Sequence, residues 1–160
     1  MKRIIGIVIG IGLLLLLGCA RGAPAGATLA TSVDDVVGVW HSTWRFGMIN
    51  FIEVYIQFKR DGTFSLAFGD RVEDQPDGEG EFSFEGTRFY WKDIVASTKS
   101  DHWWVKGKAG RTWSECLVSN PIGIYEIQLL ANGNLKLAEI EDECGVRCIL
   151  LNNTEWEPVR

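Results

Sequence analysis

The chain has 160 residues, of which 46% are hydrophobic and 23% charged, and its formal net charge is −5. This length is enough for one domain with one hydrophobic core. The sequence contains no basic patch large enough for a nucleic-acid interface, so nucleic acid is excluded from the expected partners.

The N-terminus has the features of a secretory signal. Lys2 and Arg3 make the start positive, and residues 4–17 are uncharged and apolar apart from glycines. About 20 apolar residues are needed to cross a bilayer as a helix, so this stretch is too short for a stable span. It fits the apolar core of a signal peptide.

The end of this stretch carries a more specific motif. Residues 16–19 read Leu-Leu-Gly-Cys, with Leu16 three positions before Cys19 and the small Gly18 directly before it. This resembles the lipobox of bacterial lipoproteins. The resemblance implies that residues 1–18 are removed and that Cys19 receives a lipid. The alternative is a plain signal, or an uncleaved anchor in which the cysteine occurs by chance.

The resemblance also indicates where the mature chain goes. Ala20, rather than an aspartate, follows the cysteine, which resembles outer-membrane sorting in a double-membrane bacterium. Residues 19–32 are mostly small and turn-prone, so we expect a lipidated flexible tether before a domain at 33–160. Removal of Lys2 and Arg3 leaves 14 basic against 21 acidic residues and a net charge of −7. The lipid, rather than charge, would then hold the protein to the cell envelope.

The first predicted element of the domain is one helical turn at residues 31–37. Thr31 or Ser32 can cap it, and Asp34 and Asp35 suit the positive end of its dipole. After residue 40 no stretch has an apolar repeat of helical period long enough to predict a helix.

Alternating apolar and polar side chains predict paired strands in the rest of the chain, joined by turns that often contain glycine. The expected pairs are 51–59 with 63–68 around Asp61 and Gly62, the two halves of 81–94 around Glu85 and Gly86, 101–106 with 111–118, and 124–130 with 134–140 around Asn132 and Gly133. One or two final strands are expected in 146–153 and 154–159. About eight to ten short strands in sequential hairpins predict an all-β fold, a small antiparallel up-and-down β-barrel.

Three motifs resemble the lipocalins and the wider calycin superfamily. They are Gly38-Val39-Trp40 after the helical turn, Y-x-x-F-x-x-D-G-x-F from Tyr55 to Phe64, and D-x-C-x-x-R from Asp142 to Arg147. Together they look like a bacterial lipocalin-like lipoprotein domain over residues 33–160. In those families an arginine near the last strand packs across the tryptophan and closes one barrel end. The resemblance therefore assigns this closing role to Gly38, Trp40 and Arg147, with Gly38 permitting the close approach.

A closed barrel of eight or more strands can hold one small apolar ligand. A carrier of a small hydrophobic molecule is therefore the first functional hypothesis. The alternative is a solid-core calycin barrel that acts as an inhibitor or protein-interaction factor; an enzyme is not expected. The candidate ligand-lining residues are Ile52, Val54, Ile56, Phe64, Leu66, Phe68, Phe82, Phe84, Tyr125, Ile127 and Leu129.

Three cysteines remain in the mature chain, so at most one internal disulfide is expected, in a compartment that permits it. Cys116 with Cys144 is the favoured pair, because it would tie the ends of three consecutive strands. Cys148 lies four residues further on and is the competing partner for Cys116. A disulfide is preferred to a zinc site, since a second cysteine pair is missing.

No residue is predicted to be catalytic, to ligate a metal or to bind a cofactor. His41 should point away from Trp40, because neighbours on a strand face opposite ways. His102 lies beside Asp101 in an expected exposed turn. The acidic residues of 69–81 lack the spacing of a calcium loop and are expected to form an exposed hairpin loop.

Overall fold

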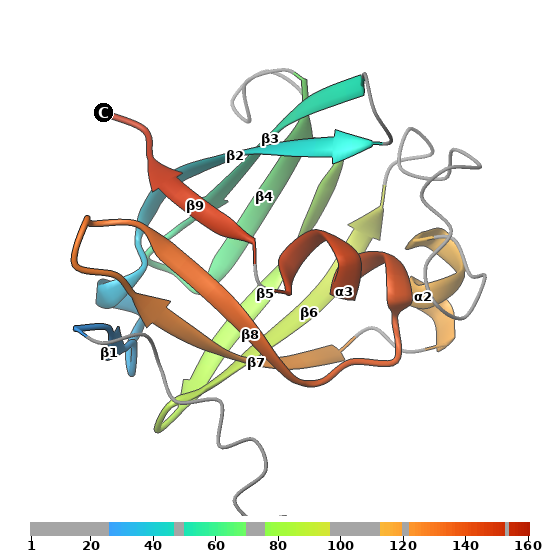
Figure 1. The fold of residues 1–160 in the computed structure, drawn as a ribbon. Helices are drawn as coiled ribbons and strands as arrows, with labels where there is room; N and C mark the ends of the chain where they lie inside the picture. Colours follow the sequence, from blue (N-terminus) through green and yellow to red (C-terminus); the bar gives the residue numbers. More distant parts are fainter. Residues whose placement is uncertain (1–25, 47–49, 70–75, 97–112, 120–121, 153) are drawn as a thin grey trace, which may run out of the picture.

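The computed structural model describes residues 26–46, 50–69, 76–96, 113–119, 122–152 and 154–160. Eight antiparallel strands form a closed barrel in which each strand pairs with the next along the chain and the last returns to the first (Figure 1). They are β2 (Gly38–Phe46), β3 (Asn50–Phe58), β4 (Thr63–Phe68), β5 (Gly78–Glu85), β6 (Arg88–Ala96), β7 (Ile122–Leu129), β8 (Leu135–Glu141) and β9 (Glu155–Pro158). The predicted all-β, up-and-down barrel is confirmed. A short additional strand, β1 (Thr28–Leu29), pairs with β7.

The predicted helical turn before the barrel is the 3-10 helix η1 (Val33–Asp35). The Asp35 carboxylate accepts hydrogen bonds from the backbone N–H groups of Thr31 and Ser32, both at 2.9 Å, and from the Ser32 hydroxyl at 3.0 Å. These bonds favour the ionised carboxylate and lower the pKa of Asp35. The turn therefore fixes the chain where it enters β2.

The barrel has two different ends. At the turn end lie η1 and the predicted hairpin turns, in which Gly62 and Gly133 have φ angles of +83° and +87° that favour glycine. At the helical end lie two short helices, α2 (Trp113–Ser119) and α3 (Gly145–Leu151) (Figure 1). The turn end was thus predicted from the sequence, and the helical end was not.

Both helices occupy segments that the sequence predicted as strands. The strand expected at 111–118 is wrong because 113–119 is α2, and the strand expected at 146–153 is wrong because 145–151 is α3. Six of the seven residues of α3 are buried, so this helix has no polar face that could produce a helical pattern in the sequence. The strand expected at 101–106 lies outside the described residues.

α3 lies in the segment between β8 and β9 and packs beside β8. β9 pairs with only two residues each of β2 and β8, all toward the turn end. Beyond them α3 lies beside β8, where the Cys148 thiol donates to the Glu139 carboxylate and the Asn152 side-chain oxygen accepts from the Glu139 N–H at 3.1 Å. Within the described ranges, no helix is long and apolar enough to cross a membrane.

Candidate functional site

The predicted ligand-lining residues all belong to the barrel core. Val54, Ile56, Phe64, Leu66, Phe82, Tyr125 and Ile127 are buried, and Ile52, Phe68, Phe84 and Leu129 are partly buried and pack against them. Their positions on the inner face therefore agree with the alternation seen in the sequence. Whether they contact a ligand stays a prediction.

Other side chains of the same chain surround these residues. Val54, Ile56, Leu66 and Ile127 are 0% exposed, so none of them borders a space that a water molecule can enter. Aromatic rings fill the interior, with the ring centroids of Phe64 and Trp91 3.7 Å apart. The largest fully buried side chains are Trp91, Trp156, Arg147, Tyr125, Phe58, Phe64 and Phe89. Around these residues the barrel is a packed core.

A buried ion-pair network fills the helical end of the interior. From α3, the Arg147 guanidinium donates two hydrogen bonds to Asp142, from Nε and Nη2 at 2.7 Å each. Its Nη1 donates to Asp93 at 2.5 Å, and Asp93 also accepts a bond from the Trp91 indole at 2.6 Å. The Tyr125 hydroxyl donates to Asp142. Residues far apart in the sequence thus converge on one arginine that is 0% exposed.

The alternation of β6 and a glycine of β7 make room for this network. Asp93 shares the inner face of β6 with Trp91, because the two are two residues apart on a strand. A Cβ atom at Gly123 would lie 2.6 Å from Asp142 Oδ2 and 2.9 Å from Arg147 Nε. Only a residue without a side chain therefore fits beside the guanidinium.

The charges of the network set its protonation. Burial disfavours the charged form of Arg147, but the hydrogen bonds that Arg147 donates to Asp142 and the charges of Asp93 and Asp142 outweigh it and raise the pKa of Arg147. Burial, followed by the charge of Asp142, raises the pKa of Tyr125 well above its ordinary value. At neutral pH the arginine is charged and the tyrosine is neutral.

The raised pKa of Tyr125 predicts a loss of stability in alkali. Because the folded-state pKa exceeds the unfolded value of about 10, the contribution of this group is complete below pH 10 and falls above it, by up to about 1.4 kcal/mol per pH unit. Urea unfolding between pH 8 and 11 should therefore show a shallower decline for Tyr125→Phe than for wild type. A Tyr55→Phe variant, altered on the outer face, should decline like wild type; equal slopes for all three would contradict the prediction.

The expected packing of Arg147 across Trp40 is wrong. Trp40 lies in β2 toward the turn end, and its indole N–H donates to the backbone carbonyl of Val36, just after η1, at 2.7 Å. Arg147 lies with Asp142 at the helical end, because the segment that carries it is a helix rather than a late strand. Gly38 also differs from expectation. A Cβ there would meet Trp40 only at an ordinary 3.9 Å, and its φ of +142° explains the glycine instead.

Trp40→Phe should lower the free energy of unfolding by about 1–3 kcal/mol, because the buried Val36 carbonyl loses its donor. Combined with Arg147→Met, the two losses should add within about 0.5 kcal/mol, since the residues lie at different barrel ends. Chemical denaturation of both single variants and the double variant measures this. A coupling energy above about 1 kcal/mol would instead support packing of Arg147 across Trp40.

The favoured disulfide is confirmed. Cys116 and Cys144 are bonded, with their Cα atoms 5.5 Å apart, and so join α2 to the N-cap residue of α3. Cys148 is a buried thiol on α3. The bond therefore ties the two helices of the helical end together.

His41 forms a pair with Glu53 on the neighbouring strand, and its ring lies 4.8 Å from that of Tyr55. The hydrogen bond from His41 is the main reason why the pKa of Glu53 is lowered. Sequence reasoning missed Glu53.

His102 and residues 70–75 of the acidic loop lie outside the described residues. In the described part of the chain, no group of three or more His, Cys, Asp or Glu side chains is placed to hold a metal ion.

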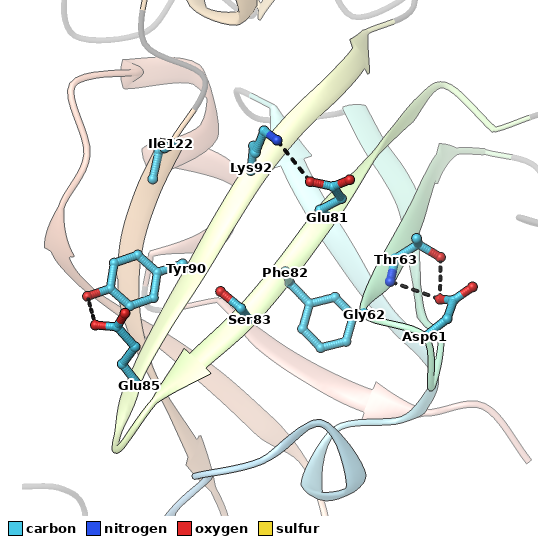
Figure 2. A pocket seen from close by; sticks show the side chains of 10 residues that line it. All are labelled: Asp61, Gly62, Thr63, Glu81, Phe82, Ser83, Glu85, Tyr90, Lys92 and Ile122. Atoms are coloured by element: carbon cyan, nitrogen blue, oxygen red, sulfur yellow. Dashed lines mark hydrogen bonds and ion pairs between the residues drawn. The ribbon is translucent and has the colours of Figure 1, made fainter.

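The outer face of the barrel carries a groove of about 420 Å³ that sequence reasoning also missed (Figure 2). On β5 the small Ser83 lies between Glu81 and Glu85, which alternation places on the same face. Ser83 pairs across the ladder with Tyr90, whose hydroxyl leans away to donate to Glu85 at 2.9 Å. The space above Ser83 is thereby left open. The outer groove is lined by Asp61, Gly62, Thr63, Glu81, Phe82, Ser83, Glu85, Tyr90, Lys92 and Ile122, of which Phe82 is a buried core residue.

The polar side chains of the outer groove are bonded to one another. Lys92 pairs with Glu81 at 2.9 Å across β5 and β6. At the β3–β4 turn the Asp61 carboxylate accepts from the N–H and the hydroxyl of Thr63 at 3.0 and 2.6 Å. These bonds hold the side chains in place on a rigid sheet. No protein-family model, curated protein or solved structure matches the chain.

Proposed function

We propose that this protein is a lipid-anchored, non-catalytic barrel of the bacterial cell envelope that binds a partner through its outer surface. The packed interior carries this proposal. An eight-stranded barrel fits a calycin-like ligand-binding fold, and such a barrel holds a ligand when its interior is open. Here aromatic rings and a buried arginine occupy that volume, which favours the solid-core alternative over a carrier.

The disulfide and the N-terminal signal support the location. A disulfide between Cys116 and Cys144 suits an oxidising compartment outside the cytoplasm. The lipobox-like residues 16–19 supply the anchor in this proposal. β1 begins at Thr28, nine residues after Cys19, so a fully extended tether would span about 30 Å. The barrel would therefore stay close to the membrane surface.

Metabolic labelling with palmitate tests the anchor. The full chain produced in a double-membrane bacterium should incorporate the label and sediment with membranes. Cys19→Ser should lose the label, whereas the matched Cys148→Ser variant should keep it. An unlabelled wild-type protein would refute lipid anchoring.

Native mass spectrometry tests the closed interior. The barrel, secreted with a plain signal in place of residues 1–19, should have the mass of the polypeptide alone, and solvent extraction should release no apolar molecule in stoichiometric amount. A bound lipid at one per chain would establish the carrier function instead.

A further inference from the structure

We propose that the outer groove is a binding site for a neutral, polyhydroxylated ligand, namely a strand of glycan. The inference rests on the proposed function, because it takes the outer surface as the working surface of the barrel. The outer groove runs from the β3–β4 turn across β5 and β6 to the start of β7, as the side chains in Figure 2 show. The proposal thus assigns the partner's binding site to this groove and the partner's chemistry to a neutral glycan.

The shape of the outer groove suits a ligand. Its volume of about 420 Å³ lies within the roughly 300–1,000 Å³ of ordinary small-molecule sites. Ser83 forms a small floor between two bonded pairs, Lys92 with Glu81 on one side and Tyr90 with Glu85 on the other. Because the floor and both walls come from paired strands, the site is formed before a ligand arrives.

The charges favour a neutral ligand. The Glu81 carboxylate is already neutralised by Lys92, and Glu85 and Asp61 accept hydrogen bonds from neighbouring hydroxyls. When an uncharged ligand covers these carboxylates, each keeps its ion-pair or hydrogen-bond partner. Carboxylates keep further acceptor positions and an ammonium keeps further donors, so sugar hydroxyls, which both donate and accept, match the lining.

Tyr90 supplies the apolar contact that sugars also need. The C–H face of a pyranose ring packs against an aromatic ring, and Tyr90 is a half-buried ring of the outer face. Its bond to Glu85 fixes the direction of the ring, and Ile122 extends the apolar surface beyond it. A rival ligand is a cationic peptide, because three carboxylates face one ammonium in the lining.

The test is a titration of the full chain in detergent micelles with the β-1,4-linked N-acetylglucosamine trimer, followed by isothermal calorimetry. Wild type should bind it. Tyr90→Ala should weaken binding at least tenfold, Ser83→Tyr should abolish it by filling the floor, and Tyr90→Phe should stay within about threefold. Tyr55→Ala, a ring removed elsewhere on the outer face, is the matched control and should bind like wild type. The unfolding midpoint of each variant confirms that it is folded.

Three results would overturn the proposal. One is the absence of binding by wild type up to about 10 mM trimer. Another is binding that Ser83→Tyr and Tyr90→Ala leave unchanged. The third is binding of a trilysine peptide, but not of the trimer, with the same dependence on Ser83 and Tyr90. None of these results refutes the proposed function, which fails separately if a stoichiometric apolar ligand is found inside the barrel.

Discussion

Arg147→Met is expected to lower the free energy of unfolding by about 3–5 kcal/mol, one of the two largest effects for this protein. The substitution leaves the buried carboxylates of Asp93 and Asp142 without the guanidinium that pairs with both of them. Arg147→Lys should recover only part of the loss, because an ammonium cannot bond Asp142 through two parallel N–H groups while reaching Asp93. Urea or guanidinium denaturation followed by tryptophan fluorescence measures all three proteins.

A second substitution separates lost charge from lost volume. If the cost comes from an uncompensated carboxylate, Arg147→Met combined with Asp93→Asn should be more stable than Arg147→Met alone. Arg88→Met, which removes an exposed arginine of β6, should change stability by no more than about 0.5 kcal/mol. A loss below 1 kcal/mol for Arg147→Met would show that the buried network contributes little.

Removal of the disulfide is expected to cost about 3–4 kcal/mol. Cys116 and Cys144 are separated by 28 positions, and closing a loop of this length restricts the unfolded chain by that amount in the loop-entropy description. The double variant Cys116→Ala with Cys144→Ala should therefore unfold at a lower denaturant concentration. The loss should exceed that of any single exposed substitution, because the bond also ties α2 to α3.

Reducing agent provides the control for this prediction. It should destabilise wild type by about the same 3–4 kcal/mol and leave the double variant unchanged. The Cys148→Ala variant should respond to reductant like wild type, since its thiol is outside the bond. Destabilisation of the double variant by reductant would contradict the assignment of the bond.

The strands could be predicted because each has one face toward the core. Along β3 the residues Val54, Ile56 and Phe58 are buried, and those between them are less so, which produces the period of two in the sequence. The glycines in the turns indicated where each hairpin reverses direction. Local sequence was therefore sufficient for the barrel and its turn end.

The helices could not be predicted because tertiary contacts select them. α3 is buried on most sides and contains Val146 and Ile149, so its sequence looks like that of a buried strand. Its bonds to Asp142 and to Asp93, which lies 54 residues away, fix it in place. A pattern within one segment carries no signal for such partners.

The same limit applies to the candidate sites. The family resemblance singled out Arg147 but gave it the partner Trp40, because the role depends on which barrel end the arginine reaches. The outer groove depends on the register between Ser83 and Tyr90 and on the diagonal bond from Tyr90 to Glu85. The alternation of Glu81, Ser83 and Glu85 was a weak signal for the outer groove. It indicates a groove only once the pairing of β5 with β6 is known.

Thermal unfolding of the secreted barrel with apolar ligands tests the packed interior most directly. Phe64→Ala is the positive control, because deleting a fully buried ring opens a cavity that a molecule such as benzene can enter. Benzene should raise the unfolding midpoint of Phe64→Ala by several degrees, whereas neither benzene nor a fatty acid should raise that of wild type. A saturable increase for wild type with a fatty acid, at one molecule per chain, would contradict the packed interior and the function proposed from it.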